Sequence, residues 1–136
     1  MMEPVTYAFK VRGDDRGSLI AVEEQRDIPF PLRRIYYIFG TQPGVTRGLH
    51  AHRQLQQVMI CLHGNCKLQL DDGRDQAIVA MESNTRGVLI DKMVWHQMYD
   101  FSSDCVLLVL ADDYYDESDY IRDYQEFERL AAAARR

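Results

Sequence analysis

Short apolar runs rich in Val, Ile, Leu, Tyr and Phe recur along most of the chain, and Gly, Asp, Asn or Pro residues separate them. This pattern is typical of an all-β sandwich or barrel, because a βαβ fold would place long amphipathic segments between its strands. We predict strands over residues 5–11, 18–23, 34–39, 57–63, 66–70, 87–90 and 105–111.

Two turns and one helix complete the predicted elements. Gly64 and Asn65 lie between two apolar runs and both tolerate positive φ, which predicts a hairpin there, and Asp71-Asp72-Gly73 predicts the next turn. Beyond Ser118, a candidate N-cap, apolar residues fall close to helical spacing at Ile121, Tyr124, Phe127 and Ala131. We expect a short C-terminal helix packed on the sheet, with Arg135 and Arg136 at the favourable end of its dipole.

Length and composition predict one compact domain over residues 1–136. The N-terminal segment lacks the pattern of a secretory signal, and no apolar stretch approaches membrane-spanning length, so we expect a cytoplasmic protein without a membrane partner. The three cysteines stand in apolar segments without metal-like spacing, which favours buried thiols. A formal net charge of −5 disfavours nucleic acid as a partner, although a few arginines could still bind a small anion.

A pair of histidines carries the strongest functional signal. His50 and His52 follow a Gly-containing turn, and alternate side chains of a strand share one face, so both imidazoles should point into the same cavity. Near neutral pH a histidine can take a proton from one carbon and return it to another. An enolate formed beside a ketone also needs hydrogen-bond donors, which Tyr37, Arg47 or His52 could supply.

The spacing of Gly44, His50, His52 and Gly64 resembles the first motif of the cupin superfamily, and His96 lies where the second motif supplies a histidine. Metal-binding cupins carry a glutamate ligand at the position of Gln57. Three histidines and an amide could still hold a divalent ion, but the missing carboxylate removes charge compensation at a dication. We therefore expect no metal and no cofactor.

Longer segments resemble the dTDP-4-keto-6-deoxyglucose 3,4-ketoisomerases, small cupins that feed amino-sugar biosynthesis. The resemblance spans nearly the whole chain, and its most specific segments are residues 13–19, 34–39, 47–52 and 105–121. It implies an all-β jelly-roll barrel with a short C-terminal helix, a homodimer, and a dTDP-linked 4-keto-6-deoxy sugar bound in the barrel mouth.

The resemblance also implies roles for individual residues. His50, as the base, would move a proton from carbon 3 to carbon 4, while His52 and Tyr37 would polarise or protonate the sugar oxygens. Arg16 or Arg47 would hold the diphosphate, and His96 would contact the substrate. Tyr36 and Tyr37 are neighbours in a strand and face opposite sides, so only one of them can line the cavity.

Three other functions remain open at this stage. A sugar-nucleotide 3,5-epimerase shares the barrel and also removes protons beside a 4-ketone. A metal-dependent cupin, such as a dioxygenase, would need an ion at the histidines. A non-catalytic sugar-binding cupin would use the same side chains only to hold its ligand.

Overall fold

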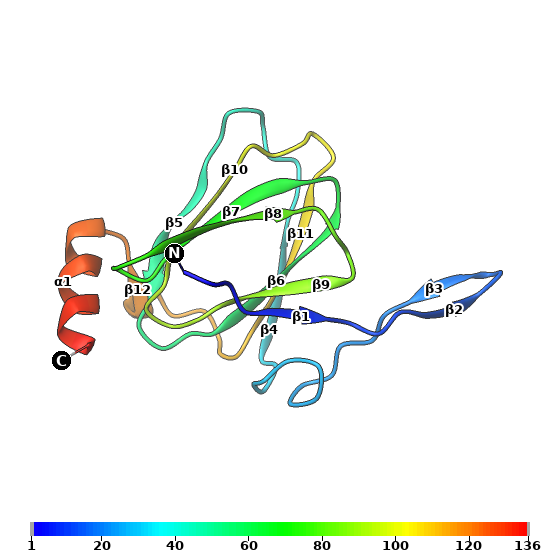
Figure 1. Ribbon diagram of the computed structural model, residues 1–136, viewed down its shortest axis with the longest axis horizontal. Helices are drawn as coiled ribbons and strands as arrows, with labels where there is room; N and C mark the ends of the chain where they lie inside the picture. The colour runs from blue at the N-terminus through cyan, green and yellow to red at the C-terminus, as the bar shows by residue number, and fades with distance from the viewer. Residues whose placement is uncertain (1, 136) are drawn as a thin grey trace.

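Two five-stranded antiparallel sheets face each other in the computed structural model, which describes residues 2–135 (Figure 1). One sheet has the order β1-β9-β6-β11-β4 and the other the order β12-β5-β10-β7-β8. Their strands are β1 Thr6–Ala8, β4 Arg34–Ile38, β5 Arg47–His52, β6 Gln57–His63, β7 Cys66–Asp71, β8 Gln76–Met81, β9 Arg86–Ile90, β10 Trp95–Tyr99, β11 Val106–Ala111 and β12 Tyr120–Ile121. The predicted all-β class is confirmed.

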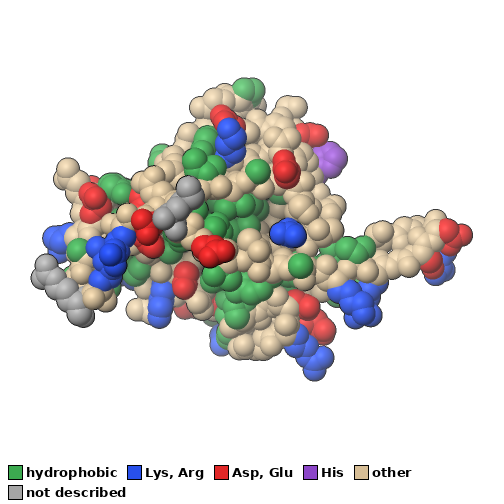
Figure 2. Space-filling model, in the orientation of Figure 1, with side chains coloured by type: hydrophobic (Ala, Val, Ile, Leu, Met, Phe, Trp, Pro, Cys, Tyr) green, Lys and Arg blue, Asp and Glu red, His purple; other side chains and the backbone are tan. Residues whose placement is uncertain are grey.

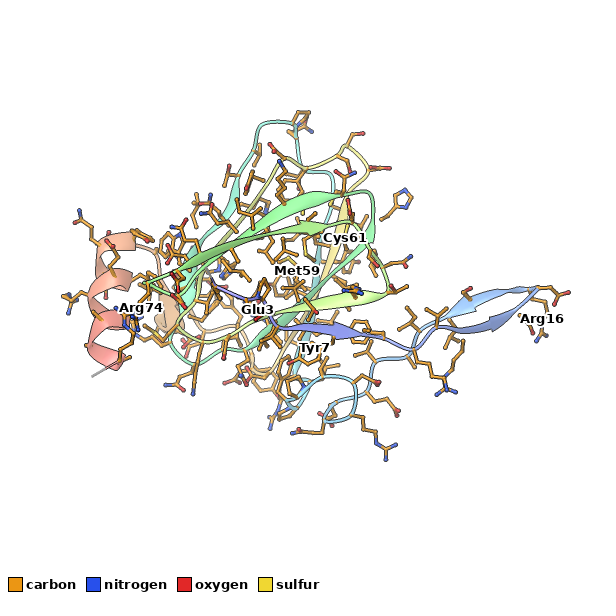
Figure 3. The ribbon with its side chains drawn as sticks, viewed as in Figure 1. Glu3, Tyr7, Arg16, Met59, Cys61 and Arg74 are labelled. Atoms are coloured by element: carbon orange, nitrogen blue, oxygen red, sulfur yellow. The ribbon has the colours of Figure 1, made fainter. Side chains whose placement is uncertain are left out.

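Apolar side chains from both sheets fill the space between them. Met59 on β6 and Val109 on β11 meet Leu68 and Leu70 on β7, and each of these side chains is almost fully buried. Alternation along each strand sends every second side chain into this core. Figure 3 shows Met59 and Cys61 within the barrel. Cys61, Cys66 and Cys105 are all free and buried, as expected.

Strands β8 and β10 were not among the predicted elements. The outward-facing residues of β8 include Gln76 and Ile78, and β10 carries His96 and Gln97 between its apolar residues. Polar side chains interrupt the apolar run in β10, whereas β8 is an apolar run that the prediction missed. Pairing with β7 on both sides nevertheless makes them regular parts of the second sheet.

The two predicted turns have different outcomes. The prediction at Gly64-Asn65 is wrong, because β6 and β7 belong to opposite sheets and the step crosses between them. Gly64 has a φ of 68°, and a Cβ there would lie 2.4 Å from Oγ of Ser102. The turn at Asp71-Asp72-Gly73 is confirmed, since it joins β7 to its antiparallel partner β8.

The C-terminal helix begins later than predicted. Helix α1 runs over Tyr124–Ala134, and the Asp123 side chain caps it by accepting a hydrogen bond from the Gln125 amide. Ser118 is not the cap, because it lies in a separate 3₁₀ turn, η1 Glu117–Asp119, and β12 stands between that turn and the helix. Arg135 follows the last helical residue, whereas Arg136 lies outside the described residues.

The helix packs on the second sheet through buried Phe127 and Ala131. Its first residue, Tyr124, also donates a hydrogen bond of 2.5 Å to the buried carboxylate of Asp71 at the end of β7. Within residues 2–135, no helix has both the length and the apolar character needed to cross a bilayer.

A third, two-stranded sheet leaves the body of the protein. Strands β2 Arg12–Asp14 and β3 Gly17–Leu19 form a hairpin that projects like an arm beyond both main sheets (Figures 1 and 2). The predicted strand over residues 5–11 is confirmed in part, because β1 lies within it and pairs with β9 in the first sheet. The predicted strand over residues 18–23 is not part of a main sheet: its first two residues belong to β3, which pairs with β2 alone, and all six strand residues of the arm are exposed.

Candidate active site

A cavity of about 200 Å³ lies between the two sheets at the end where β4, β5, β10 and β12 meet. The alternation of each strand turns its polar residues inward at this end. The polar lining consists of Arg34, Tyr36, Arg47, His50, His96 and Tyr120.

His50 and His96 line this cavity, and His52 forms a cluster of three histidines with them. The ring centroids of His50 and His52 are 4.9 Å apart, and those of His50 and His96 are 4.6 Å apart. Nδ1 of His50 lies 3.0 Å from the carbonyl oxygen of Gly48, and Nδ1 of His96 lies 3.2 Å from that of Val94. A carbonyl can only accept, so these two rings carry their protons on Nδ1 and leave Nε2 with a free lone pair.

A β-bulge in β5 orients the side chain of His50. The strand pairs His50 with His96 and Gly48 with Gln97, so Leu49 is an extra residue without a partner on β10. Leu49 has a φ of 61°, a left-handed conformation that costs a non-glycine residue on the order of 1 kcal/mol. Gly48 is required beside it, because a Cβ there would lie 2.9 Å from the carbonyl oxygen of His96.

Burial keeps the histidine cluster uncharged near neutral pH. The pKa of His50 is lowered, chiefly because burial penalises the charged ring. The pKa of His52 falls to about 4 and that of His96 to about 3, first through burial and then through the neighbouring His50. Each ring is therefore neutral at neutral pH and keeps one unprotonated nitrogen, while burial makes uptake of a further proton less favourable than in water.

The structure corrects the choice between the two adjacent tyrosines. Tyr37 points away from the cavity, with 62% of its surface exposed, and stacks on Phe39 at a centroid distance of 5.8 Å. Tyr36 is the inward residue and donates a hydrogen bond of 2.5 Å to Oε1 of Gln57. Burial, assisted by Tyr120, raises the pKa of Tyr36 to about 12, so its hydroxyl stays protonated.

Arg34 and Tyr120 also face the cavity, and sequence reasoning singled out neither. Arg34 lies two residues before Tyr36 on the inward face of β4, and its buried Nε has no hydrogen-bond partner among the described residues. Tyr120 pairs with His52 across β12 and β5, and its ring centroid lies 4.8 Å from that of His50. Strand alternation was the available signal for Arg34, whereas nothing local marks Tyr120.

The two arginines assigned to the diphosphate lie far apart. Arg47, at the start of β5, borders the cavity. Arg16 does not, because it lies at the tip of the projecting hairpin, as Figure 3 shows, and bonds to Asp14 of the same hairpin at 2.6 Å. Within one chain Arg16 therefore does not reach the histidine cavity, whereas Arg47, the other residue expected to hold the diphosphate, does.

The histidine cluster has the residue types and the spacing of a candidate metal site, since one ring nitrogen from each of His50, His52 and His96 lies within 4.8 Å of the others. Gln57 occupies the position of the fourth cupin ligand, and its amide oxygen already accepts a hydrogen bond from Tyr36.

A second, smaller cavity of about 140 Å³ lies on the other side of Arg34 and Tyr120. His52 and Asp119 both border it, and Nδ1 of His52 lies 3.3 Å from Oδ2 of Asp119. His52 thus separates this polar cavity from the other two histidines.

The paired sheets and the histidine cavity define the cupin class of sugar isomerases and epimerases. The family model described as "FdtA: WxcM-like, C-terminal" matches residues 2–132, and the chain belongs to this family. A curated relative, TDP-4-oxo-6-deoxy-alpha-D-glucose-3,4-oxoisomerase of Aneurinibacillus thermoaerophilus, is 50% identical over 96% of this chain and 94% of its own length.

Solved structures agree with this assignment. A 3,4-ketoisomerase from Helicobacter canadensis is 44% identical, with a TM-score of 0.92 over 97% of this chain and 99% of its own. A histidine-to-asparagine mutant of the 3,4-ketoisomerase QdtA from Thermoanaerobacterium thermosaccharolyticum, in complex with TDP-4-keto-6-deoxyglucose, is 39% identical. Its TM-score is 0.93 over 98% of this chain and 96% of its own. The expected family, cupin fold and ketoisomerase activity are confirmed.

Proposed function

We propose that this enzyme converts TDP-4-keto-6-deoxyglucose into the corresponding 3-keto sugar, with His50 as the base. The observation that carries the proposal is the cluster of neutral imidazoles at a cavity that also contains Tyr36 and two arginines. The substrate class rests on the relatives named above.

The reaction needs two proton movements. One proton leaves carbon 3 and returns at carbon 4, while a second leaves the hydroxyl on carbon 3 and arrives at the former ketone oxygen on carbon 4. A free lone pair on Nε2 suits His50 to the carbon proton through an enediol intermediate. His52 and Tyr36 serve the oxygen proton, and Tyr36 takes the role that the sequence assigned to Tyr37.

Positive charge around the cavity supports binding of an anion. The lining of the 200 Å³ cavity includes the guanidinium groups of Arg34 and Arg47 but no carboxylate. We assign the diphosphate to Arg47, which is exposed at the edge of the cavity, and His96 to the sugar. A whole nucleotide sugar needs more room than this, because ligand pockets usually measure about 300–1,000 Å³. The nucleotide therefore extends out of the cavity.

A homodimer would explain both the projecting arm and the outer face of β4. This edge strand exposes Ile35 and Tyr37, and Phe39 directly after it extends them into an apolar row of the kind that a partner covers. The hairpin carries exposed Val11 and Leu19 and ends in Arg16, which has no role in its own chain's cavity. We propose that two copies associate and that each hairpin brings Arg16 to the site of its partner.

Mixed dimers test this arrangement. An Arg16→Ala protein and a His50→Asn protein should each have little activity. Co-expressed, they should recover about a quarter of wild-type activity, since half of randomly formed dimers are mixed and each has one intact site. Full activity of Arg16→Ala alone, or no recovery on co-expression, would contradict the proposal that each hairpin brings Arg16 to the site of its partner.

The structure of the product tests the proposed reaction. Incubated with TDP-4-keto-6-deoxyglucose and then a trapping transaminase, the enzyme should give a product whose amino group NMR places on carbon 3. A ketone retained at carbon 4 with an inverted neighbour would indicate an epimerase, and binding without turnover would indicate a sugar-binding protein.

Chelation tests the metal requirement. We expect undiminished turnover after exhaustive chelation, because Gln57 replaces the carboxylate ligand of metal cupins. Loss of turnover in chelator, with recovery when one divalent metal is added, would show metal dependence.

A further inference from the structure

His52 differs from the other two histidines in the acceptor that faces its Nδ1. His50 and His96 turn this nitrogen toward backbone carbonyls of their own strands. His52 turns it toward the carboxylate of Asp119, whose Oδ2 lies 3.3 Å away. The His52 side chain is only 3% exposed, and Nδ1 has no well-aligned hydrogen-bond partner in residues 2–135.

The Asp119 carboxylate is held in place by the loop that follows His52. The Gln54 amide donates to Oδ1 at 2.9 Å, and the Leu55 amide donates to Oδ2 at 3.2 Å. The Arg53 amide donates to the backbone carbonyl of Asp119 at 2.9 Å. These three bonds fix the carboxylate relative to the ring beside it, with 16% of its side chain exposed at the second cavity.

We propose that Asp119 is a positioning residue for the ketoisomerase reaction, because it keeps the His52 proton on Nδ1 and so presents an unprotonated Nε2 to the other histidines. The sugar oxygen proton then has an acceptor, and the carboxylate stabilises the imidazolium while His52 holds that proton. This inference rests on the proposed function, in which His52 serves the oxygen proton.

The groups around His52 show why such a partner matters. His50, His96 and Tyr120 pack against the ring, and Arg34 faces it from β4. Burial, His50 and Arg34 all lower the pKa of His52, whereas Asp119 raises it. Without the carboxylate, His52 would take up a proton less readily and its tautomer would no longer be fixed.

Asp112 offers a matched control. Its carboxylate also accepts a hydrogen bond from this loop, from the Gln56 amide at 3.0 Å, but no contact joins it to a histidine among the described residues. Asp119→Asn and Asp112→Asn therefore make the same chemical change in the same region. We expect Asp119→Asn to lower kcat about 10- to 100-fold with little change in KM, the range typical of lost histidine-orienting partners. Asp112→Asn should retain wild-type kcat.

A second background separates positioning from general support of the loop. In a His52→Gln protein, Asp119→Asn should lower kcat by less than about twofold, because residues that act through one another are not additive. An equal loss in both backgrounds, or the same loss with Asp112→Asn, would overturn the proposal.

Imidazole ¹⁵N spectra give a readout that does not depend on turnover. His52, assigned by its absence from the His52→Gln spectrum, should show a protonated Nδ1 in the wild type and a mixture of tautomers in Asp119→Asn. An unchanged tautomer would overturn the inference. Absence of a 3-keto product from the wild type would instead contradict the proposed function, and the spectra would still test the link between Asp119 and His52.

Discussion

His50→Asn is expected to abolish isomerisation while TDP binding stays nearly intact. Asparagine keeps much of the shape and hydrogen bonding of histidine but cannot take a proton near neutral pH. Loss of a general base should lower kcat by at least about 10²-fold. Nucleotide contacts lie elsewhere, at Arg47 in our assignment, so the Kd for TDP should not change. Steady-state kinetics and calorimetric titration with TDP measure the two effects separately.

Solvent deuterium provides the control for His50. In deuterated water the wild type should incorporate deuterium at carbon 4 to the extent that the base exchanges its proton before returning it, and His50→Asn should show neither exchange nor turnover. Near-normal turnover of His50→Asn, with loss of turnover in His52→Asn, would show that His52 is the base.

The pH dependence of kcat/KM gives a further prediction for His50. Because burial lowers the pKa of His50, the wild type should lose kcat/KM only as pH falls below the ordinary histidine range.

Tyr36→Phe is expected to lower kcat about 10- to 100-fold, because the cavity loses a protonated hydroxyl at the sugar oxygens. The change also removes the hydrogen bond to the buried Gln57 amide, so the free energy of unfolding should fall by about 1–3 kcal/mol. Assays well below the midpoint of thermal unfolding separate the two effects.

Tyr37→Phe is the matched comparison for this variant. It makes the same chemical change one residue along β4, on the exposed face. The kcat per active site should therefore equal that of the wild type. If Tyr37→Phe impaired kcat and Tyr36→Phe did not, the orientation of β4 in the working enzyme would have to be reversed.

The histidine pair could be predicted from sequence because strand alternation is a local rule. His50 and His52 needed only a strand and one buried face. The same rule showed that Tyr36 and Tyr37 face opposite sides, but choosing between them required the register of β4 against β11, which pairs Tyr36 with Val109. Register is a long-range property that a single sequence does not encode locally.

The rest of the site depends on contacts between distant segments. Asp119 and Tyr120 reach the histidines because β12 pairs with β5, and a two-residue strand has no recognisable pattern. The same strand explains the misplaced helix start, since the apolar Ile121 belongs to β12 and is buried against the helix instead of within it. The distance of Arg16 from its own chain's cavity could not be predicted either, because the direction in which a hairpin leaves the barrel depends on contacts outside the hairpin.

The pairing of β12 with β5 also has a consequence for protein synthesis. A nascent chain emerging from the ribosome can form both main sheets except β12 before residues 117–121 appear. Until then the histidines would lack the aromatic wall of Tyr120 and the carboxylate of Asp119, and water would reach them freely. We therefore expect catalytic competence to arise late, as this closing segment docks. A chain released just before residue 117 would carry the catalytic histidines in an unfinished site.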